Sequence, residues 1–144
     1  MNLECKVMTS EDLEDILSYG MAQLSGEGID KEMKSWHAVW RREALEHYAP
    51  LGWSFVSRDQ GQLQGYVLAQ PVLFFKGWTQ TLWIEHISAH SPELKTYLFE
   101  VVYRWARDKH FQKVYFHDSL QFINSALWPI ERDGLIQSLS TTKM

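Results

Sequence analysis

Cysteine and long apolar runs are both scarce in this sequence, and their scarcity excludes several classes of protein. A single cysteine, Cys5, cannot form a disulfide within the chain or supply a cysteine-ligated metal cluster. No apolar run approaches the roughly 18–20 residues that a membrane-spanning helix requires. The first residues, MNLECKVM, carry Glu4 early and lack the apolar stretch of a secretory signal peptide. We therefore expect a cytoplasmic protein that does not bind a membrane.

Basic residues are too few for a protein that binds nucleic acid. Lysine and arginine total 14 against 18 aspartates and glutamates, which gives a net charge of −4. Nucleic-acid affinity depends heavily on neutralising phosphates, so this balance predicts no nucleic-acid partner. Aromatic residues make up 14% of the chain, and without a basic stripe they are most simply core and pocket walls. The 144 residues, 45% of them hydrophobic, suit one domain over residues 1–144.

Glycine is absent from residues 84–99, IEHISAHSPELKTYLF, where a strand leads into a helix. A helix N-terminus that follows a strand directly is a common phosphate site, because its N–H groups and positive dipole end face the ligand. Such sites usually need glycine so that the backbone can approach the phosphate closely. Ser91 as N-cap and Pro92 at the first helical position predict an ordinary helix start instead.

Hydrophobic periodicity predicts strands and helices along the whole chain. The expected strands cover residues 2–8, 53–58, 63–75, 80–89, 114–118 and 135–140. One helix should follow Thr9, whose side chain can form a capping box with Asp12. The other expected helices cover residues 31–48, 92–109 and 122–133. This order, a three-strand meander and then a crossover helix, predicts an α+β or mixed α/β fold.

Some of these expectations depend on single positions. The inner side of the helix over 31–48 would carry four residues at helical spacing, Met33, Trp36, Trp40 and Ala44. Pro71 indicates a bulge or a local sheet edge within its strand. Pro129 interrupts the helix over 122–133, and Gly134 would end it.

Three stretches of the sequence follow one another in the order found in a known superfamily. They are TSEDL (9–13), where a strand meets a helix, FVSRDQGQLQGYVLAQ (55–70), over a hairpin with Gly65, and IEHISA (84–89), in a central strand. Together they resemble the GNAT (Gcn5-related N-acetyltransferase) superfamily along nearly the whole chain. The resemblance implies a GNAT-like α+β fold, with a central, mostly antiparallel, twisted sheet of about six to seven strands flanked by about four helices.

The resemblance also implies a cofactor site, since that superfamily binds acyl-coenzyme A in a V-shaped split between the fourth and fifth strands. Backbone of the fourth strand would contact the acyl-pantetheine arm, and the start of the next helix would hold the phosphates. The residues so placed are Ile87, Ser88, Ala89, Ser91, Glu93, Leu94 and Lys95. Glu93 and Lys95 stand where the family has two glycines, and the loop before them is short. We therefore expect weak or absent binding of acetyl-coenzyme A.

Glu85 is the first candidate for a catalytic base, and His86 is the second. Glu85 lies four residues before Ala89, where the resemblance implies the residue that deprotonates an acceptor amine. Regular alternation would put Glu85, Ile87 and Ala89 on one face of the strand and His86 on the other. A glutamate on a solvated face or in an ion pair is the simpler alternative. Ile130 stands where the family has a thiolate-protonating tyrosine, and isoleucine has no proton to give.

Two further groups of residues suggest sites. One set has the chemical types of a metal site: Glu85, His86, His90, His117 and Asp118. Its spacing matches no ligand motif, so we expect no metal. Trp36 and Trp40 would shape the acceptor pocket, because the second helix of the superfamily lines the acceptor groove. Tryptophans at helical spacing that pack in the core are the alternative.

Two functions stay open on the sequence. The first is an acyl-coenzyme A-dependent N-acyltransferase with a remodelled cofactor loop, which would transfer an acetyl group to the amine of a small molecule or a protein. The second is a non-catalytic binding or regulatory module of the same fold, favoured by the missing glycines and the missing tyrosine. Aromatic residues on an acidic surface would also suit a protein contact such as a homodimer.

Overall fold

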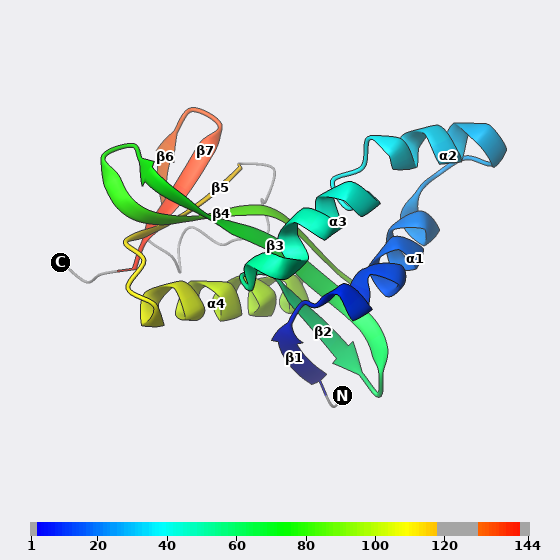
Figure 1. Ribbon diagram of the computed structural model, residues 1–144, viewed down its shortest axis with the longest axis horizontal. Coiled ribbons are helices and arrows are strands. Elements are labelled where there is room, and N and C mark those ends of the chain that lie inside the picture. The colour runs from blue at the N-terminus through cyan, green and yellow to red at the C-terminus, as the bar shows by residue number, and fades with distance from the viewer. Residues whose placement is uncertain (1–2, 118–129, 142–144) are drawn as a thin grey trace.

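The computed structural model describes residues 3–117 and 130–141 of the chain. Within these residues seven strands form one sheet, in the order β1-β2-β3-β4-β5-β7-β6 (Figure 1). The strands are β1 (Leu3–Val7), β2 (Phe55–Asp59), β3 (Gln62–Phe75), β4 (Trp78–Ala89), β5 (Lys113–His117), β6 (Glu131–Asp133) and β7 (Ile136–Ser140). The pair β4–β5 is parallel, and the other neighbouring pairs are antiparallel. The expected α+β fold with a mostly antiparallel sheet is therefore confirmed.

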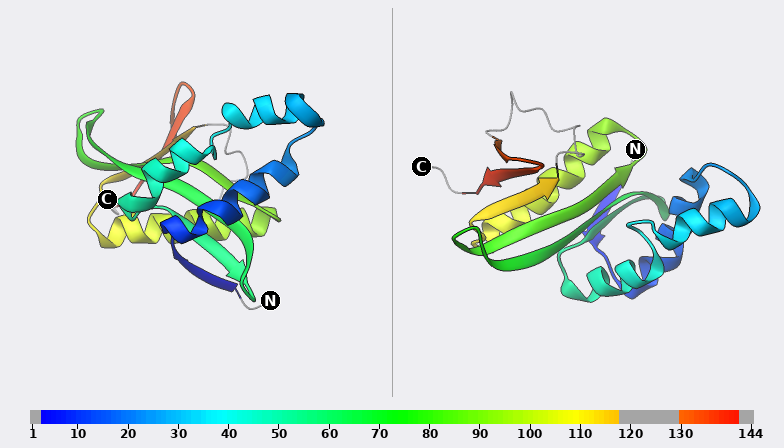
Figure 2. Two further views of the ribbon diagram at one scale, coloured as in Figure 1. Left: turned by 45° about the vertical axis from the view of Figure 1, so that its right-hand side comes forward. Right: turned by 90° about the horizontal axis from the view of Figure 1, so that it is seen from above.

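Helices cover both faces of this sheet. The described helices are α1 (Leu13–Gln23), α2 (Gly28–Trp36), α3 (Arg42–Tyr48) and α4 (Pro92–Asp108), with 3-10 turns η1 (Ser10–Asp12) and η2 (Ala49–Leu51). Figure 2 shows α4 on one face and α1 and α3 on the other. Val67 and Leu68 of β3 are both fully buried but pack in separate clusters, because successive strand side chains point to opposite faces. We call the two sides the α4 face and the α1–α3 face.

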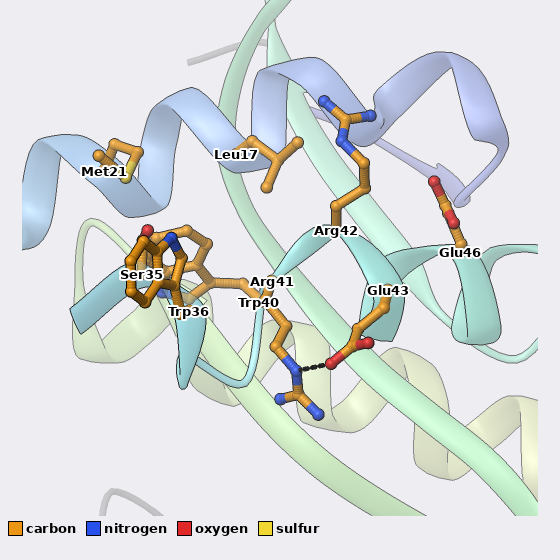
Figure 3. A pocket seen from close by; sticks show the side chains of 9 residues that line it. All are labelled: Leu17, Met21, Ser35, Trp36, Trp40, Arg41, Arg42, Glu43 and Glu46. Atoms are coloured by element: carbon orange, nitrogen blue, oxygen red, sulfur yellow. Dashed lines mark hydrogen bonds and ion pairs between the residues drawn. The ribbon is translucent and has the colours of Figure 1, made fainter. Parts of the chain in front are cut away.

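The helix predicted over 31–48 is wrong, because the chain forms two helices there, α2 and α3, joined by a turn. Trp40 in that turn is 8% exposed, and a Cβ on Gly20 of α1 would lie 2.4 Å from its indole ring. Burying an indole against a glycine outweighs the helical preference of turn residues such as Ala38. The break turns Met33 and Trp36 outward, and Trp36 stands beside Trp40 on the wall of a pocket (Figure 3).

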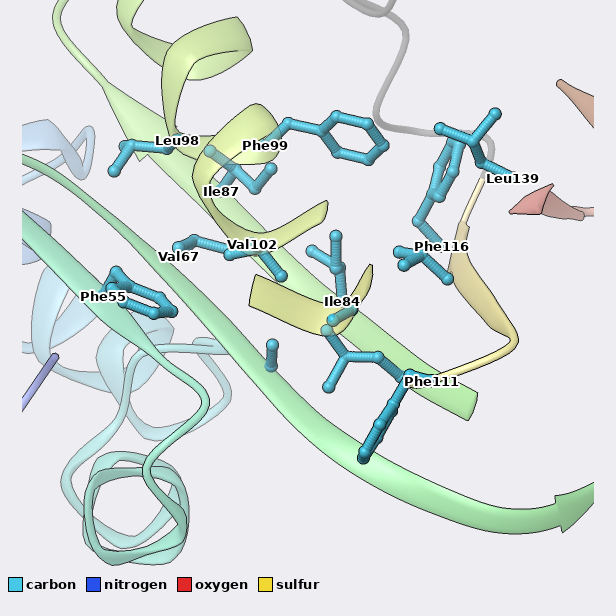
Figure 4. Close-up of a cluster of buried hydrophobic side chains, with 14 of the residues drawn as sticks. Phe55, Val67, Ile84, Ile87, Leu98, Phe99, Val102, Phe111, Phe116 and Leu139 are labelled. Atoms are coloured by element: carbon cyan, nitrogen blue, oxygen red, sulfur yellow. The ribbon is translucent and has the colours of Figure 1, made fainter. Parts of the chain in front are cut away.

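The α4 face carries the larger apolar core, shown in Figure 4. Leu98 and Val102 of α4 have no exposed surface, as their helical spacing predicts. Phe99 of the same helix packs edge-on against Phe116 of β5, with ring centroids 5.3 Å apart. Each fully buried side chain of this kind contributes about 1.5–3 kcal/mol relative to exposure. This core fixes α4 against β4 and β5.

The predicted helix over 122–133 is corrected in its last residues. Residues 118–129 lie outside the described part of the chain, and residues 131–133 form the strand β6, which pairs with β7. Gly134, expected to end a helix, has a φ of +63° in the turn between β6 and β7. Glu131 forms an ion pair with Lys113 of β5, and Asp133 forms one with Lys76 in the turn between β3 and β4. These contacts come from segments distant in the sequence, which local periodicity does not report.

The helix caps and the proline position are as predicted. The capping box between Thr9 and Asp12 is present, and Thr9 N donates to Asp12 Oδ2 at 2.9 Å. Ser91 Oγ accepts a hydrogen bond from Leu94 N at 3.2 Å. Pro71 lies at a local sheet edge, because β2 pairs with β3 only as far as residue 67.

A β-bulge interrupts the pairing of β3 with β4. Leu68 stands opposite His86 and Ala69 stands opposite Ile84, so Glu85 is one extra residue on β4. At the same place β4 loses its other neighbour. The parallel pairing of β4 with β5 runs from residue 81 opposite 113 to residue 84 opposite 116 and is not continued by Glu85 and the residue after Phe116. In the described residues the pairing of the two strands therefore ends just before Glu85.

Candidate active site

The bulge decides which way Glu85 and His86 point. Ile84 and Ile87 both pack in the core of the α4 face, with two residues between them where a regular strand would have one. His86 lies with its ring 5.7 Å from that of Tyr66, which belongs to the core of the opposite face. Glu85 lines a pocket with residues of α3 on that same face. Glu85 and His86 thus share the α1–α3 face, and the expectation that Glu85 shares a face with Ile87 is wrong.

Glu85 opens into a polar pocket of about 450 Å³ between α3 and the sheet. The lining residues are Val39, Arg41, Glu43, Ala44, His47, Tyr48 and Glu85. Trp83 Nε1 donates a hydrogen bond to Glu85 Oε2 at 2.5 Å. In the described residues it is the one hydrogen bond that the carboxylate accepts. Hydrogen bonds to charged groups are worth about 1.5–3 kcal/mol, so Oε2 is held in place and Oε1 accepts no hydrogen bond from the described residues.

Tyr48 is a member of this site that the sequence analysis missed. It ends α3 and is 7% exposed. Burial, together with the negative charge of Glu85, raises the pKa of Tyr48 to about 12 against the opposing effect of Arg41. The phenol therefore keeps its proton at neutral pH and is a hydrogen-bond donor beside the carboxylate. No local pattern connects the last residue of a helix with a strand so far along the chain.

His86 is held as a neutral imidazole. Burial lowers the pKa of His86 below its ordinary value, Glu85 opposes this change, and Lys95 adds to it. A histidine with a lowered pKa carries no proton on one ring nitrogen at pH 7 and can accept one. His86 thus has the protonation state that a second base beside Glu85 would need.

The start of α4 uses most of its own N–H groups. Pro92 has no N–H, Leu94 N donates to Ser91 Oγ at 3.2 Å, and Lys95 N donates to Ser91 O at 3.1 Å. In the described chain the N–H of Glu93 is then the one first-turn donor without a hydrogen bond. The Glu93 side chain is exposed beside that donor, and its negative charge opposes the binding of an anion.

The last residues of β4 have one backbone edge that no described strand pairs with. Ile87 to Ala89 pair with β3 on one side, while in the described residues β5 pairs with β4 no further than residue 84. A Cβ on Gly65 of β3 would lie 2.7 Å from Ser88 O, so a glycine is required where the two strands approach this closely. The predicted cofactor residues therefore lie together, on one strand edge and the helix start that follows it.

The two tryptophans predicted to bind the acceptor play different roles. Trp40 is part of the core, and Trp36 is 56% exposed on the wall of the pocket of about 510 Å³ in Figure 3. That pocket shares Arg41 and Glu43 with the pocket of Glu85, and the two side chains form an ion pair at 2.5 Å. An exposed ion pair is worth roughly 0–1 kcal/mol, so breaking this pair to connect the two pockets would cost little free energy.

Those residues of the suggested metal set that the structure describes do not gather into a metal site. Among residues 3–117 and 130–141 no group of three or more His, Cys, Asp or Glu side chains is arranged to hold a metal ion. His90 is exposed and lies with its ring 5.4 Å from that of Tyr19, and Asp118 falls outside the described residues. None of the helices in the described chain combines the length and the apolar character that crossing a membrane requires.

Comparisons with other proteins identify a family and a fold. The profile of a family described as "Protein of unknown function (DUF1999)" matches residues 31–126. A GNAT family acetyltransferase from Brucella melitensis, in complex with acetyl-CoA, has a TM-score of 0.69 and 16% identity, covering 99% of this chain and 90% of that one. PaiA N-acetyltransferase from Thermoplasma acidophilum, in complex with coenzyme A, has a TM-score of 0.68 and 14% identity over 97% and 99% of the two chains.

A third structure, the polyamine N-acetyltransferase of Drosophila melanogaster, has a TM-score of 0.64 and 12% identity over 96% of this chain and 99% of its own. No curated protein matches the sequence. At such low identities these likenesses show the GNAT fold and leave the activity to be argued from the residues of the site.

Proposed function

The chain belongs to the DUF1999 family, and we propose that it is an acyl-coenzyme A-dependent N-acyltransferase that transfers an acetyl group to an amine. The observation that carries this proposal is a coincidence of two features at one residue. β4 parts from β5 at Glu85, and the bulge at Glu85 turns its carboxylate into a pocket. A free strand edge beside a positioned carboxylate is what a thioester and an amine need in order to meet.

Glu85 is the residue to which we assign the role of base. An ordinary alkylammonium has a pKa of about 10.4, so at neutral pH its nitrogen must lose a proton before it has a lone pair to react. Oε1 of Glu85 accepts that proton, while the hydrogen bond from Trp83 keeps Oε2 in place. His86, neutral and adjacent, is the second candidate for the same task.

Acetyl-coenzyme A, when bound, would supply the thioester carbonyl carbon to which the nitrogen bonds. The C–S bond would break, and the departing sulfur would take up the second proton that the nitrogen loses. The residues fit the acyl-pantetheine arm better than the phosphates. Ile87 to Ala89 present backbone groups along the free edge of β4. At the start of α4 the Glu93 N–H is the remaining donor, and Lys95 adds one point charge. We therefore propose a remodelled cofactor loop with low affinity.

Binding of acetyl-coenzyme A is the first test. A ligand that binds the folded protein raises its melting temperature by mass action. We expect saturable binding with a Kd below about 100 µM, roughly −5.5 kcal/mol, followed by tryptophan fluorescence and melting temperature. No response at millimolar concentration would contradict the proposal.

The role of Glu85 needs its own variant and a matched control. Glu85→Gln should lower the turnover of amine acetylation roughly 100- to 10,000-fold, because the amide cannot accept the proton. Its Kd for acetyl-coenzyme A should stay near that of the unchanged protein. Glu43→Gln alters another carboxylate of the same pocket, one that pairs with Arg41, and should leave turnover within a few-fold. Equal effects of the two variants would remove Glu85 from the role.

A second function, a non-catalytic binding module, is favoured by two observations. The start of α4 offers few donors to a pyrophosphate. The apolar residues Ile29, Met33 and Trp36 stand exposed on α2, as a protein contact or a homodimer interface would require. Size-exclusion chromatography of the unchanged protein and of Trp36→Ala, together with the titration above, distinguishes the two functions. An assembly that depends on Trp36 in a protein that does not bind acetyl-coenzyme A would favour the module.

A further inference from the structure

An apolar pocket of about 260 Å³ lies on the α1–α3 face, and one of its lining residues, Trp83, donates a hydrogen bond to Glu85. Its walls come from four strands, β3, β4, β5 and β7, and are formed by Val72, Phe75, Thr81, Trp83, Tyr115 and Ile136. The volume is slightly below the roughly 300–1,000 Å³ of sites for whole small molecules. The pocket therefore suits one apolar group of a ligand rather than a whole ligand.

The polar atoms around this pocket are largely occupied. Thr81 Oγ1 donates to Val72 O at 2.5 Å, and Trp83 Nε1 donates to Glu85. The rings of Phe75 and Tyr115 meet edge-on, with centroids 4.8 Å apart, and form an aromatic wall. A group bound there would meet ring faces and methyl groups. Aromatic or branched apolar groups match such a wall, and charged groups would lose their water without a partner.

Trp83 connects this pocket with the candidate base. Its indole ring is part of the apolar wall, and its Nε1 holds Glu85 Oε2. The pocket and the carboxylate therefore have the Trp83 side chain in common. A ligand with its nitrogen at Glu85 Oε1 and its apolar end in the pocket would need a linker that passes this one side chain.

The charges near the pocket argue against a second ammonium group in the ligand. Glu131 and Asp133 of β6 are the carboxylates on the strand that borders β7, and they already pair with Lys113 and Lys76. Lys113 also lies 5.1 Å from the ring of Trp78. A long polyamine reaching this end of the sheet would meet two lysines whose counter-ions are already paired.

We propose that the acceptor is a primary amine joined by a short alkyl linker to one aromatic ring, with the ring bound between Phe75, Trp83 and Tyr115. This inference rests on the proposed function, because it places the amine at Glu85. The pocket selects the apolar end of the acceptor, and Glu85 takes the proton from the other end. Val72 and Ile136 close the pocket around the ring and set its size.

Calorimetry on the full chain tests the pocket directly, with 2-phenylethylamine as the probe and ethylamine and spermidine as comparisons. We expect 2-phenylethylamine to bind at least tenfold more tightly than either. Ile136→Trp fills the pocket and should abolish that preference. Leu135→Trp adds the same ring at the neighbouring position, which is 63% exposed, and should preserve the preference. Val72→Phe is the second filling variant, used if Ile136→Trp melts well below the unchanged protein.

The outcomes separate this inference from the proposed function. Equal binding of the three amines, tighter binding of spermidine, or an undiminished preference in a folded filling variant would overturn the aromatic acceptor. Selective amine binding by a protein that does not bind acetyl-coenzyme A would support the pocket and refute the transferase. With acetyl-coenzyme A present, the ratio of kcat/KM for 2-phenylethylamine over ethylamine should exceed ten and should fall toward one in the filling variant.

Discussion

The two halves of β4 differ in how many neighbours they have. Trp78 to Ile84 are flanked by β3 on one side, and the last four of these residues by β5 on the other. His86 to Ala89 are bonded to β3 alone among the described strands, and Glu85 is the extra residue before them. The first half buries Leu82 and Ile84 completely, whereas the second begins with an extra residue and carries the polar side chains of the site.

The difference shows where a sheet can carry the side chains of a reactive site. A strand with both edges paired has its backbone donors and acceptors used and its direction fixed. Once one edge is free, an added residue costs little pairing, and it can turn two successive side chains to one face. The bulge at Glu85 lies at that boundary, which is why both candidate bases point into the α1–α3 face.

The largest expected effect separates the halves by stability. Ile84→Ala should lower the free energy of unfolding by about 2–5 kcal/mol, because it empties a fully buried position where β4 is paired on both edges. Glu85→Gln should change it by less than about 1 kcal/mol, since the amide oxygen can still accept from Trp83. Urea denaturation measures both. Equal losses would mean that the two halves are not distinct.

A smaller effect is expected from the glycine that supports the second half. Gly65→Ala should cost about 1–3 kcal/mol, because its Cβ would come within 2.7 Å of Ser88 O and force β3 and β4 apart. Gln62→Ala on the exposed end of the same strand should stay within about 0.5 kcal/mol. Thermal unfolding of both variants is the measurement. A harmless Gly65→Ala would show that this half of β4 moves freely.

The helix start that follows the second half can be tested for a purely structural role. Ser91→Ala should cost about 1 kcal/mol, since Leu94 N loses its cap, and Ser91→Asp should restore that loss. Under the proposed remodelled loop, Ser91→Ala should leave the Kd for acetyl-coenzyme A within about threefold, because Ser91 Oγ is already committed to Leu94. A large rise in Kd with little loss of stability would instead make Ser91 a ligand of the cofactor.

The smallest effect depends on pH and comes from His86. Its pKa is lowered in the folded protein, so the unfolded chain binds a proton first as the pH falls. The contribution of His86 to stability is therefore fully present above a pH of about 6.5 and is lost as the pH falls below that value. His86→Gln should flatten the fall in unfolding free energy between about pH 7.5 and 5. His37→Gln, at an exposed position, should retain the slope of the unchanged protein.

The sequence allowed much of the fold to be predicted, because its main signals are local. Alternation and helical stripes located β1 to β5 and α4, and the side-chain chemistry of Thr9 and Ser91 located two helix starts. Local signals failed where a tertiary contact decided the outcome. The long helix over 31–48 is broken because Trp40 packs on Gly20, and β6 forms where its carboxylates reach a lysine of β5 and a lysine of the turn before β4.

The sequence proposed some residues of the candidate site, but neither all of them nor their arrangement. Glu85 was identified as the candidate base, but regular alternation assigned it to the wrong face, since a bulge is a property of pairing with another strand. Tyr48 and the apolar pocket beside Trp83 carry no sequence signal, because their parts come from a helix end and from four strands.

By itself the sequence determined the periodic elements, the helix caps and the absence of glycine before α4, because each of these depends on residues only a few positions apart. The tertiary structure alone decided that β4 and β5 separate at Glu85, that two adjacent polar residues face the same way, and that an aromatic pocket lies beside them. The reason is that strand pairing brings together residues far apart in the chain, and only that pairing determines where an extra residue must bulge.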